Sequence, residues 1–372
     1  MVWKKEPANL KRLLIVAAVD NITEKLMEIV KMAGKVVTFG EIMLRLAPYN
    51  YERIIQANQF QATYGGGEAN VAVSLAQFGH DVYFVSRLPE NALGDAACKT
   101  LSGFGVHVNH VVRGGSRMGI YFLEHGASIR PSRVIYDRAC SAISDIQTEM
   151  VNWEKIFHGK DWFHITGITP AISKTAAQVS LEAIKVAQKA GLTVSCDLNY
   201  RKKLWTREQA RETMTELVKY VDVIISNEED AYDVFGITAG NSDVTTGRLI
   251  VEKYQSVAKQ LVDLSGAQKV AITLRESLSA SDNNWSAMLY DGSDFFLSRK
   301  YPIHLIDRVG GGDSFCAGLI HGIINRWDTQ KVLEFAVAAS ALKQTIPGDM
   351  NLIAEIEVLA VMDGDVSGRV QR

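Results

Sequence analysis

The chain has 372 residues, 47% of them hydrophobic, and a formal net charge of −2 at pH 7. Without an excess of basic residues, nucleic acid is not expected as a partner, and no run reaches the roughly 20 apolar residues of a membrane span. The four cysteines, Cys98, Cys140, Cys196 and Cys316, are scattered and form no C-x-x-C pair. We therefore expect reduced thiols in a cytoplasmic protein rather than disulfides or a zinc site.

The first 34 residues are predicted to be an N-terminal extension outside the main fold. A basic segment precedes the short apolar run 13–19, which Asp20 ends without a cleavage site for a signal peptide. An extra helix and an alternative start at Met32 are both compatible with this pattern.

A regular pattern of elements begins at Lys35. Residues 36–39 form a short apolar run that predicts a buried strand. In the segment 43–64, apolar and polar residues are interleaved, which favours half-buried strands. A glycine run at 65–67 then precedes apolar residues at helical spacing, and Gly79 stands where that helix would end.

Beyond residue 150 the chain alternates between short strands and longer helices. Strands are predicted at 161–165, 192–197, 222–226 and 269–274, and helices at 173–190, 206–219 and 247–264. This alternation predicts a doubly wound α/β domain over residues 35–350, with a mostly parallel sheet covered by helices on both faces. Helices at 313–325 and 329–344 close the domain, and residues 351–372 are predicted to be a C-terminal tail.

Two β-rich segments, within about 43–64 and 106–140, do not follow this alternation. We expect them to pair into a small sheet, a lid that projects over the C-terminal edge of the main sheet, where open α/β folds bind their ligands. Such a lid has exposed strand edges that a second lid would cover. The sequence therefore predicts a homodimer through the lid strands.

The strongest motif is the segment 307–315, Asp-Arg-Val-Gly-Gly-Gly-Asp-Ser-Phe. Its glycines, Gly310, Gly311 and Gly312, allow a tight turn whose N–H groups can approach a ligand. The helix that follows adds the partial positive charge of its N-terminus, which makes the segment suitable as an anion hole for a phosphoryl group in transfer. Asp313, at the mouth of this hole, is the candidate base for an alcohol. An ordinary helix end followed by an N-capping Asp is the structural alternative.

This segment resembles the C-terminal signature Asp-Thr-x-Gly-Ala-Gly-Asp of the ribokinase-like (PfkB-type) carbohydrate kinases, with Arg308 in place of Thr and Gly311 in place of Ala. The segment 65–72, Gly-Gly-Gly-Glu-Ala-Asn-Val-Ala, is similar to the family's N-terminal signature Gly-Gly-x-x-x-Asn-x-Ala. The resemblance covers residues 35 to 350. It implies a kinase fold and sugar contacts from the first signature, through Gly66, Gly67 and Asn70.

Within the family, the segment 197–201, Asp-Leu-Asn-Tyr-Arg, resembles a motif of 2-keto-3-deoxygluconate kinases. Asn199 and Arg201 would then lie at the C-terminal end of a strand, near the substrate. A guanidinium group binds either a carboxylate or a phosphate bidentately. A surface loop with a solvated Arg is the alternative interpretation.

The run 119–123 is similar to the lid strand that brings a Tyr, here Tyr121, to the substrate in those kinases. They often carry an Arg two positions later, where this chain has Leu123. The segment Tyr136-Asp137-Arg138 lies nearby. Its Arg138 is the candidate to supply the missing cation and Tyr136 a further candidate substrate contact, with an exposed pair at a strand edge as the alternative.

The resemblance also implies ATP and Mg²⁺ as cofactors. The family's Asn-x-x-Glu element corresponds to residues 227–230, Asn-Glu-Glu-Asp, in which Asn227 would contact the nucleotide. Glu229 and Asp230 are the candidates to hold Mg²⁺ through water, because Mg²⁺ keeps several waters and takes few carboxylates.

On the nucleotide side, Thr273 and Arg275 stand where the family commonly has a glycine-rich loop. Ala339 belongs to a segment expected by analogy to flank the adenine, and a buried helix in the core is the equally good alternative for this segment. Gly310 and Gly312 would contact phosphate. The family also suggests a monovalent cation near Asp307.

The predicted function is the ATP-dependent phosphorylation of a sugar or sugar acid at a primary hydroxyl, with 2-keto-3-deoxygluconate converted to its 6-phosphate as the favoured reaction. Kinases for fructose, ribose or a deoxy-inositol acid are alternatives, as is a non-catalytic sugar- or nucleotide-binding protein on the same fold. A dinucleotide-binding dehydrogenase is disfavoured, because the first glycine-rich segment does not directly follow a parallel strand.

Overall fold

The computed structural model of the protein describes residues 33–227, 229–238 and 251–364. The chain from Gly34 onward clusters into one compact unit. The N-terminal extension predicted for residues 1–34 lies outside the described residues, apart from its last two positions.

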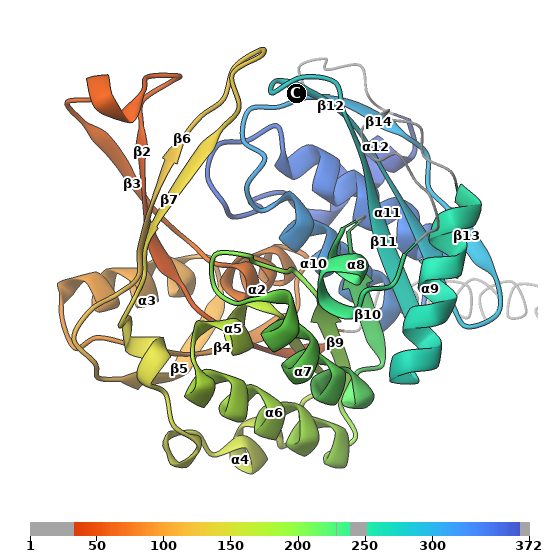
Figure 1. Ribbon diagram of the computed structural model, residues 1–372, viewed down its shortest axis with the longest axis horizontal. Helices are drawn as coiled ribbons and strands as arrows, with labels where there is room; N and C mark the ends of the chain where they lie inside the picture. The colour runs from red at the N-terminus through yellow and green to blue at the C-terminus, as the bar shows by residue number, and fades with distance from the viewer. Residues whose placement is uncertain (1–32, 228, 239–250, 365–372) are drawn as a thin grey trace, which may run out of the picture. The chain divides into compact units, whose positions relative to one another are not determined.

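A ten-stranded sheet forms the centre of this unit, in the order β13-β12-β11-β10-β9-β8-β1-β4-β5, with β14 paired to β12 (Figure 1). The pairs from β5 to β11 are parallel, and those of β12 with β11, β13 and β14 are antiparallel. The strands are β1 Lys35–Phe39, β4 Asp81–Leu88, β5 Val106–Arg113, β8 Trp162–Thr166, β9 Thr193–Asp197, β10 Val223–Ser226, β11 Lys269–Ser277, β12 Asp282–Tyr290, β13 Phe295–Leu297 and β14 Tyr301–His304. Central strands such as β8 are buried along their whole length, as expected for a parallel sheet covered on both faces.

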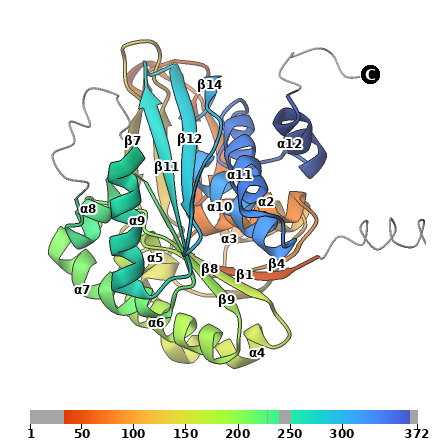
Figure 2. The same ribbon diagram turned by 90° about the vertical axis from the view of Figure 1, so that its right-hand side faces the viewer.

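Helices cover the two faces of the main sheet and bury a separate apolar cluster on each side (Figure 2). One face carries α2 Gly67–Gln77, α3 Ala92–Gly103, α10 Gly311–Ile324, α11 Thr329–Lys343 and α12 Glu355–Met362. The other carries α4 Trp153–Phe157, α5 Ile168–Ile172, α6 Lys174–Lys189, α7 Arg207–Leu217, α8 Asp230–Phe235 and α9 Val251–Ser265. Short 3₁₀ turns occupy Ile54–Gln56, Ala142–Asp145, Thr148–Met150 and Val218–Tyr220.

The doubly wound α/β architecture predicted from the sequence is confirmed, and the predicted strands and helices appear close to their expected positions. The segment predicted as a tail contains a further helix, α12, whose Val358 is fully buried in the core. No helix within the described ranges is long and apolar enough to cross a membrane.

A separate small sheet has the strand order β3-β2-β6-β7 and stands apart from the main sheet in Figure 1. Its strands are β2 Met43–Pro48, β3 Phe60–Gly65, β6 Ile120–Glu124 and β7 Arg133–Asp137. The prediction is corrected for one strand: β5, which was assigned to the small sheet, pairs with β4 in the main sheet. As the edge strand there, β5 is mostly half-buried or exposed, and this explains why its sequence alternates like that of a lid strand.

Candidate active site

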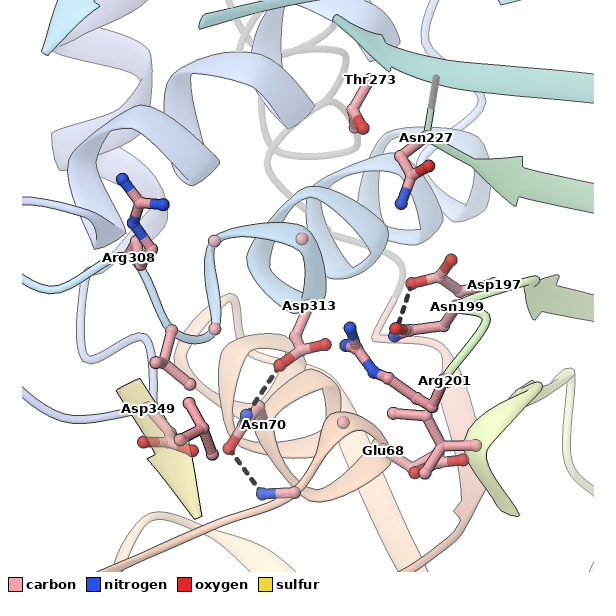
Figure 3. Close-up of a pocket in the computed structure, with 18 of the residues that line it drawn as sticks. Glu68, Asn70, Asp197, Asn199, Arg201, Asn227, Thr273, Arg308, Asp313 and Asp349 are labelled. Carbon is pink, nitrogen blue, oxygen red and sulfur yellow. Dashed lines mark hydrogen bonds between the residues drawn. The ribbon is translucent and has the colours of Figure 1, made fainter. Parts of the chain in front are cut away.

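A cavity of about 390 Å³ lies between the small sheet, the C-terminal ends of β9, β10 and β11, and the start of α10. Figure 3 shows a close-up of this cavity with residues that line it. The residues predicted for substrate, nucleotide, metal and catalysis line it with one exception; these are Gly66, Gly67, Asn70, Tyr121, Tyr136, Arg138, Asn199, Arg201, Asn227, Glu229, Asp230, Thr273, Arg275, Gly310, Gly311, Gly312 and Asp313. The exception is Ala339, which is fully buried within α11 and does not line the cavity.

The glycine turn forms the start of α10. Gly310 is the N-cap residue and has φ 83°, in the left-handed region that favours glycine. The N–H of Gly311 donates to the carbonyl of Arg308 at 3.3 Å. The N–H groups of Gly312 and Asp313 lie in the first turn of the helix, where no earlier helical carbonyl can accept them. They are therefore the donors best placed for an anion.

Asp313 connects the two glycine-rich signatures of the sequence. Its Oδ2 accepts a hydrogen bond of 2.7 Å from Nδ2 of Asn70, which lies on α2. The Asn70 Oδ1 in turn accepts the N–H of Gly66 at 3.3 Å, and this fixes the orientation of the amide (Figure 3). Burial raises the pKa of Asp313 to about 6, although the hydrogen bond from Asn70 opposes the rise. This pKa suits a general base near neutral pH.

Four further carboxyl groups in the cavity have raised pKa values, among them Asp349, whose pKa is raised by burial. Burial raises the pKa of Asp197 well above its ordinary value, and the charges of Asp230 and Asp313 add to the effect. Burial also raises the pKa of Asp230 to about 6 and that of Glu68 to about 7. The Glu68 Oε1 accepts hydrogen bonds from the hydroxyls of Thr166 and Thr169, at 2.8 and 2.7 Å. Several carboxyl groups with raised pKa values in one cavity are typical of a catalytic site.

Positively charged side chains balance these acids from several elements. The Arg201 guanidinium points toward the Asp313 carboxylate (Figure 3), and its charge lowers the pKa of that carboxyl against the larger effect of burial. Arg138 forms an ion pair with Glu41, so its charge is already partly neutralised. Arg275 and Arg308 also line the cavity, and burial together with the Arg275 charge lowers the pKa of Arg308.

Two side chains that were expected to contact a ligand, those of Tyr121 and Asp307, are bound to other residues of the protein. The Tyr121 hydroxyl donates to Oδ2 of Asp349 at 2.5 Å, so it is already used within the protein. The Asp307 carboxylate, near which a monovalent cation was suggested, forms an ion pair of 2.5 Å with Nη2 of Arg45. It also accepts the N–H of Gly348 at 3.0 Å.

Some lining residues were not predicted. Asn283 and Trp285, on β12, each have a buried polar side-chain atom without a hydrogen-bond partner among the described residues: Asn283 Oδ1 and Trp285 Nε1. The sequence showed only a β-rich run here and gave no sign that these residues line the cavity. Arg308 and Glu68 also line the cavity. In the sequence, Arg308 departs from the C-terminal signature of the family, and Glu68 is the acidic residue within the N-terminal signature.

The predicted metal ligands fit Mg²⁺ only as a water-mediated pair. The described residues contain no group of three or more His, Cys, Asp or Glu side chains that could hold a metal ion directly. Asp230 does provide a buried oxygen, Oδ2, with no hydrogen-bond partner in the described part of the chain. Because Mg²⁺ retains several waters and takes few carboxylates, one unpartnered carboxylate oxygen on a residue that lines the cavity is compatible with it.

A doubly wound sheet, a small sheet above its C-terminal edge and a glycine turn beside a buried carboxylate together define a small-molecule phosphotransferase. Residues 33–355 match the pfkB family of carbohydrate kinases, and the chain belongs to this family. The predicted ribokinase-like, PfkB-type kinase is thus confirmed.

Several relatives match over most of the chain. The 2-dehydro-3-deoxygalactonokinase of Haloferax volcanii is 30% identical over 337 residues, which cover 91% of this chain and 99% of the relative. The 2-dehydro-3-deoxygluconokinase of Bacillus subtilis is 28% identical and covers 87% of this chain and 94% of its own length. The crystal structure of 2-dehydro-3-deoxygluconokinase from Thermotoga maritima superposes with a TM-score of 0.86 at 50% identity, covering 89% of this chain and 100% of that one.

Proposed function

We propose that the protein transfers the γ-phosphoryl group of ATP to the primary hydroxyl of a 2-keto-3-deoxy sugar acid, with 2-keto-3-deoxygluconate 6-phosphate as the favoured product. The observation that carries the proposal is the Asn70–Asp313 hydrogen bond of 2.7 Å, which brings a buried base to the residues of the sugar signature. Similarity to 2-dehydro-3-deoxygluconokinase from Thermotoga maritima at 50% identity supports the choice of a sugar acid.

The acid group of such a substrate requires a cation in the cavity. Arg201 is the best candidate, because it follows β9 into the cavity, whereas Arg138 is held by Glu41. Asn199 next to it is oriented by a hydrogen bond of 3.2 Å from its Nδ2 to Asp197. Tyr136 contributes a half-exposed ring at the small sheet, within 6.0 Å of Tyr121 between ring centroids.

In the proposed reaction, Asp313 accepts the proton of the sugar hydroxyl as that oxygen attacks the γ-phosphorus of ATP, and the bond from this phosphorus to the bridging oxygen breaks to release ADP. The N–H groups of Gly312 and Asp313 then donate to the phosphoryl oxygens, on which negative charge accumulates. The small sheet covers the cavity and limits the access of water, so transfer to the sugar competes favourably with hydrolysis.

ATP and Mg²⁺ are the proposed cofactors. Asn227, Thr273, Arg275 and Arg308 line the cavity beside the glycine turn, where they would hold the nucleotide phosphates. Asp230, through its unpartnered Oδ2, and Glu229 would hold water molecules of the metal ion. When bound, Mg²⁺ neutralises charge on the transferring phosphate.

The monovalent cation suggested near Asp307 is not needed for charge balance. We infer that Arg45 supplies this charge, because its guanidinium already pairs with Asp307 and with Asp349, at 2.5 and 2.6 Å. Turnover should accordingly be similar in sodium, potassium and Tris buffers. A strong activation by K⁺ would contradict this inference.

An ADP-release assay tests the proposed substrate. With Mg-ATP, we expect the highest kcat/KM for 2-keto-3-deoxygluconate, followed by its C4 epimer 2-keto-3-deoxygalactonate, the substrate class of the Haloferax relative. Fructose, ribose and a deoxy-inositol acid should be much poorer acceptors. A preference for fructose or ribose over both sugar acids would refute the assignment, and ³¹P NMR of the product identifies the phosphorylated position.

We also propose that two copies of the chain associate through their small sheets. Four side chains lie in one cross-strand row on the face that points away from the cavity: Ala62, Leu46, Phe122 and Ile135. Phe122 packs edge to face on Phe60 with a centroid distance of 5.9 Å, and Ile135 is 52% exposed. An apolar row with free strand edges at β3 and β7 favours a symmetric contact.

A cytoplasmic location is the remaining proposal. The four cysteines are all free thiols, and Cys140 is exposed. Free thiols of this kind are typical of a reducing compartment. Recovery of the protein with secreted material after cell fractionation would contradict this location.

A further inference from the structure

A group of buried charges lies beside the glycine turn and takes no part in the proposed reaction. It consists of Arg45, Asp307, Lys343 and Asp349, which we call the Arg45 cluster; all are at most 3% exposed. Arg45 belongs to β2 of the small sheet, whereas the other three belong to the body of the protein. Burying charges is unfavourable unless they are well paired, so these four side chains must be held in closely defined positions.

Arg45 bridges two carboxylates that are 42 positions apart in the sequence. Its Nη1 donates to Oδ1 of Asp349 at 2.6 Å, and its Nη2 donates to Oδ2 of Asp307 at 2.5 Å. The Nη2 also lies 3.3 Å from Nε2 of His125, which must accept, because a guanidinium has no acceptor. Burial lowers the pKa of His125, consistent with this neutral, accepting ring. A planar fork is needed to reach both carboxylates at once.

On the body side, the cluster holds the backbone of the glycine turn. Asp307 Oδ1 accepts the N–H of Val309 at 3.1 Å, and Lys343 Nζ donates to the carbonyl of Asp307 at 3.3 Å. Asp349 packs against Gly310 so closely that a Cβ at Gly310 would lie 1.8 Å from the Asp349 carbonyl oxygen. The conformation of the turn therefore depends on where Asp307 and Asp349 are held.

On the small-sheet side, three strands meet the same carboxylate. Tyr121 on β6, paired in register with Arg45, donates its hydroxyl to Oδ2 of Asp349 at 2.5 Å. Gly65, the last residue of β3, approaches Asp349 so closely that a Cβ there would lie 2.0 Å from Oδ2. The small sheet thus contacts the body at the residues that shape the anion hole.

We propose that Arg45 is a positioning residue that couples the small sheet to the glycine turn. Its guanidinium holds Asp307 and Asp349 together only when the small sheet lies over the cavity. One side chain therefore sets both the conformation of the glycine turn, which would face the phosphoryl group, and the position of the small sheet, which excludes water. The inference rests on the proposed role of the glycine turn as an anion hole. It assigns Arg45 no contact with either substrate.

Two variants at this position separate positioning from simple stability. Arg45→Lys keeps the charge but cannot span both carboxylates, so kcat should fall roughly tenfold or more, because misplacement of about 1 Å is costly for transfer. Arg45→Ala should lower kcat by about 10²-fold, and millimolar guanidinium should restore part of it by occupying the space between the carboxylates. ATP hydrolysis without a sugar should rise relative to transfer, since the cover is loosened.

The control is Arg113→Lys, which changes a partly exposed arginine paired with Asp95 at 2.7 Å, away from the cavity. It should leave kcat unchanged. The acceptor is whichever sugar the wild-type enzyme phosphorylates best, so a wrong substrate assignment does not affect the result.

Wild-type kcat in Arg45→Lys would overturn the proposal, as would guanidinium that raises the thermal midpoint of Arg45→Ala without raising kcat. If Arg45→Ala does not fold, Arg45→Lys decides alone.

Discussion

Asp313 must be ionised to accept a proton, yet its position in the cavity favours the protonated form. Burial raises its pKa to about 6. Below that pH the carboxyl is protonated in the free enzyme and the base is lost; above it the base is fully present. We therefore expect kcat/KM for the sugar to fall as the pH drops through about 6, by about tenfold for each further pH unit. A pH–rate profile between pH 4.5 and 8 measures this directly.

Asp230 is the matched control, because burial raises its pKa to about 6 as well. Asp230→Asn should keep the acidic limb of the profile, even if weaker metal binding lowers the rate. Asp313→Asn should bind ATP normally and lose about 10²-fold or more in turnover. An acidic limb that disappears in Asp230→Asn would assign the titration to Asp230 instead.

The residues of the site were predictable where a signature names them. Asn70 and Asp313 stand in two signatures that the fold joins through one hydrogen bond. Arg45 was not predictable, because its role depends on Asp307 and Asp349, which are distant in sequence and belong to another part of the fold. An arginine between Leu44 and Leu46 in a strand is the local sign of a buried charge, but it does not identify the partners.

At the level of single elements, the turn into α10 requires glycine at position 310. Gly310 has φ 83°, and an added Cβ would lie 1.8 Å from the carbonyl oxygen of Asp349. A left-handed conformation costs a non-glycine residue roughly 1–2 kcal/mol, and the clash with backbone adds to this. We expect Gly310→Ala to lower the free energy of unfolding by more than about 2 kcal/mol, measured by urea denaturation.

The neighbouring position provides the comparison. A Cβ at Gly312 meets no atom within 4 Å, and its φ lies outside the left-handed region. Gly312→Ala should therefore unfold at the same urea concentration as the wild type, or slightly higher, since alanine favours a helix. Equal midpoints for Gly310→Ala and Gly312→Ala would show that the turn relaxes without cost.

The elements themselves follow from the sequence where burial is complete. Fully buried strands such as β8 and β10 appear as short apolar runs, and the helices between them carry one apolar face. The edge strand β5 is mostly half-buried or exposed, so its alternating pattern is the same as that of a lid strand. Only the pairing with β4 distinguishes the two cases, and pairing depends on the whole fold.

At the scale of the whole molecule, the small sheet has two different faces. Its inner face carries a small apolar cluster of Met43, Ala47, Tyr121 and Leu123, of which Met43 and Tyr121 line the cavity. Its outer face carries the row from Ala62 to Ile135, of which Ile135 is 52% exposed. A sheet with an apolar outer face, and with free edges at β3 and β7, is expected to pair with a second copy.

Ile135→Lys places a charge in the middle of that outer row, and burying an unpaired charge in an interface is strongly unfavourable. The wild type should therefore sediment as a dimer at micromolar concentration, and Ile135→Lys as a monomer. Ile356→Lys is the control, because Ile356 is 75% exposed on α12, outside the small sheet. It should remain a dimer.

Since Val134 and Tyr136, on either side of Ile135, line the cavity, the monomeric variant should also show a higher KM for the sugar if pairing steadies β7. A wild type that sediments as a monomer at all concentrations would show that the outer row stays exposed to solvent.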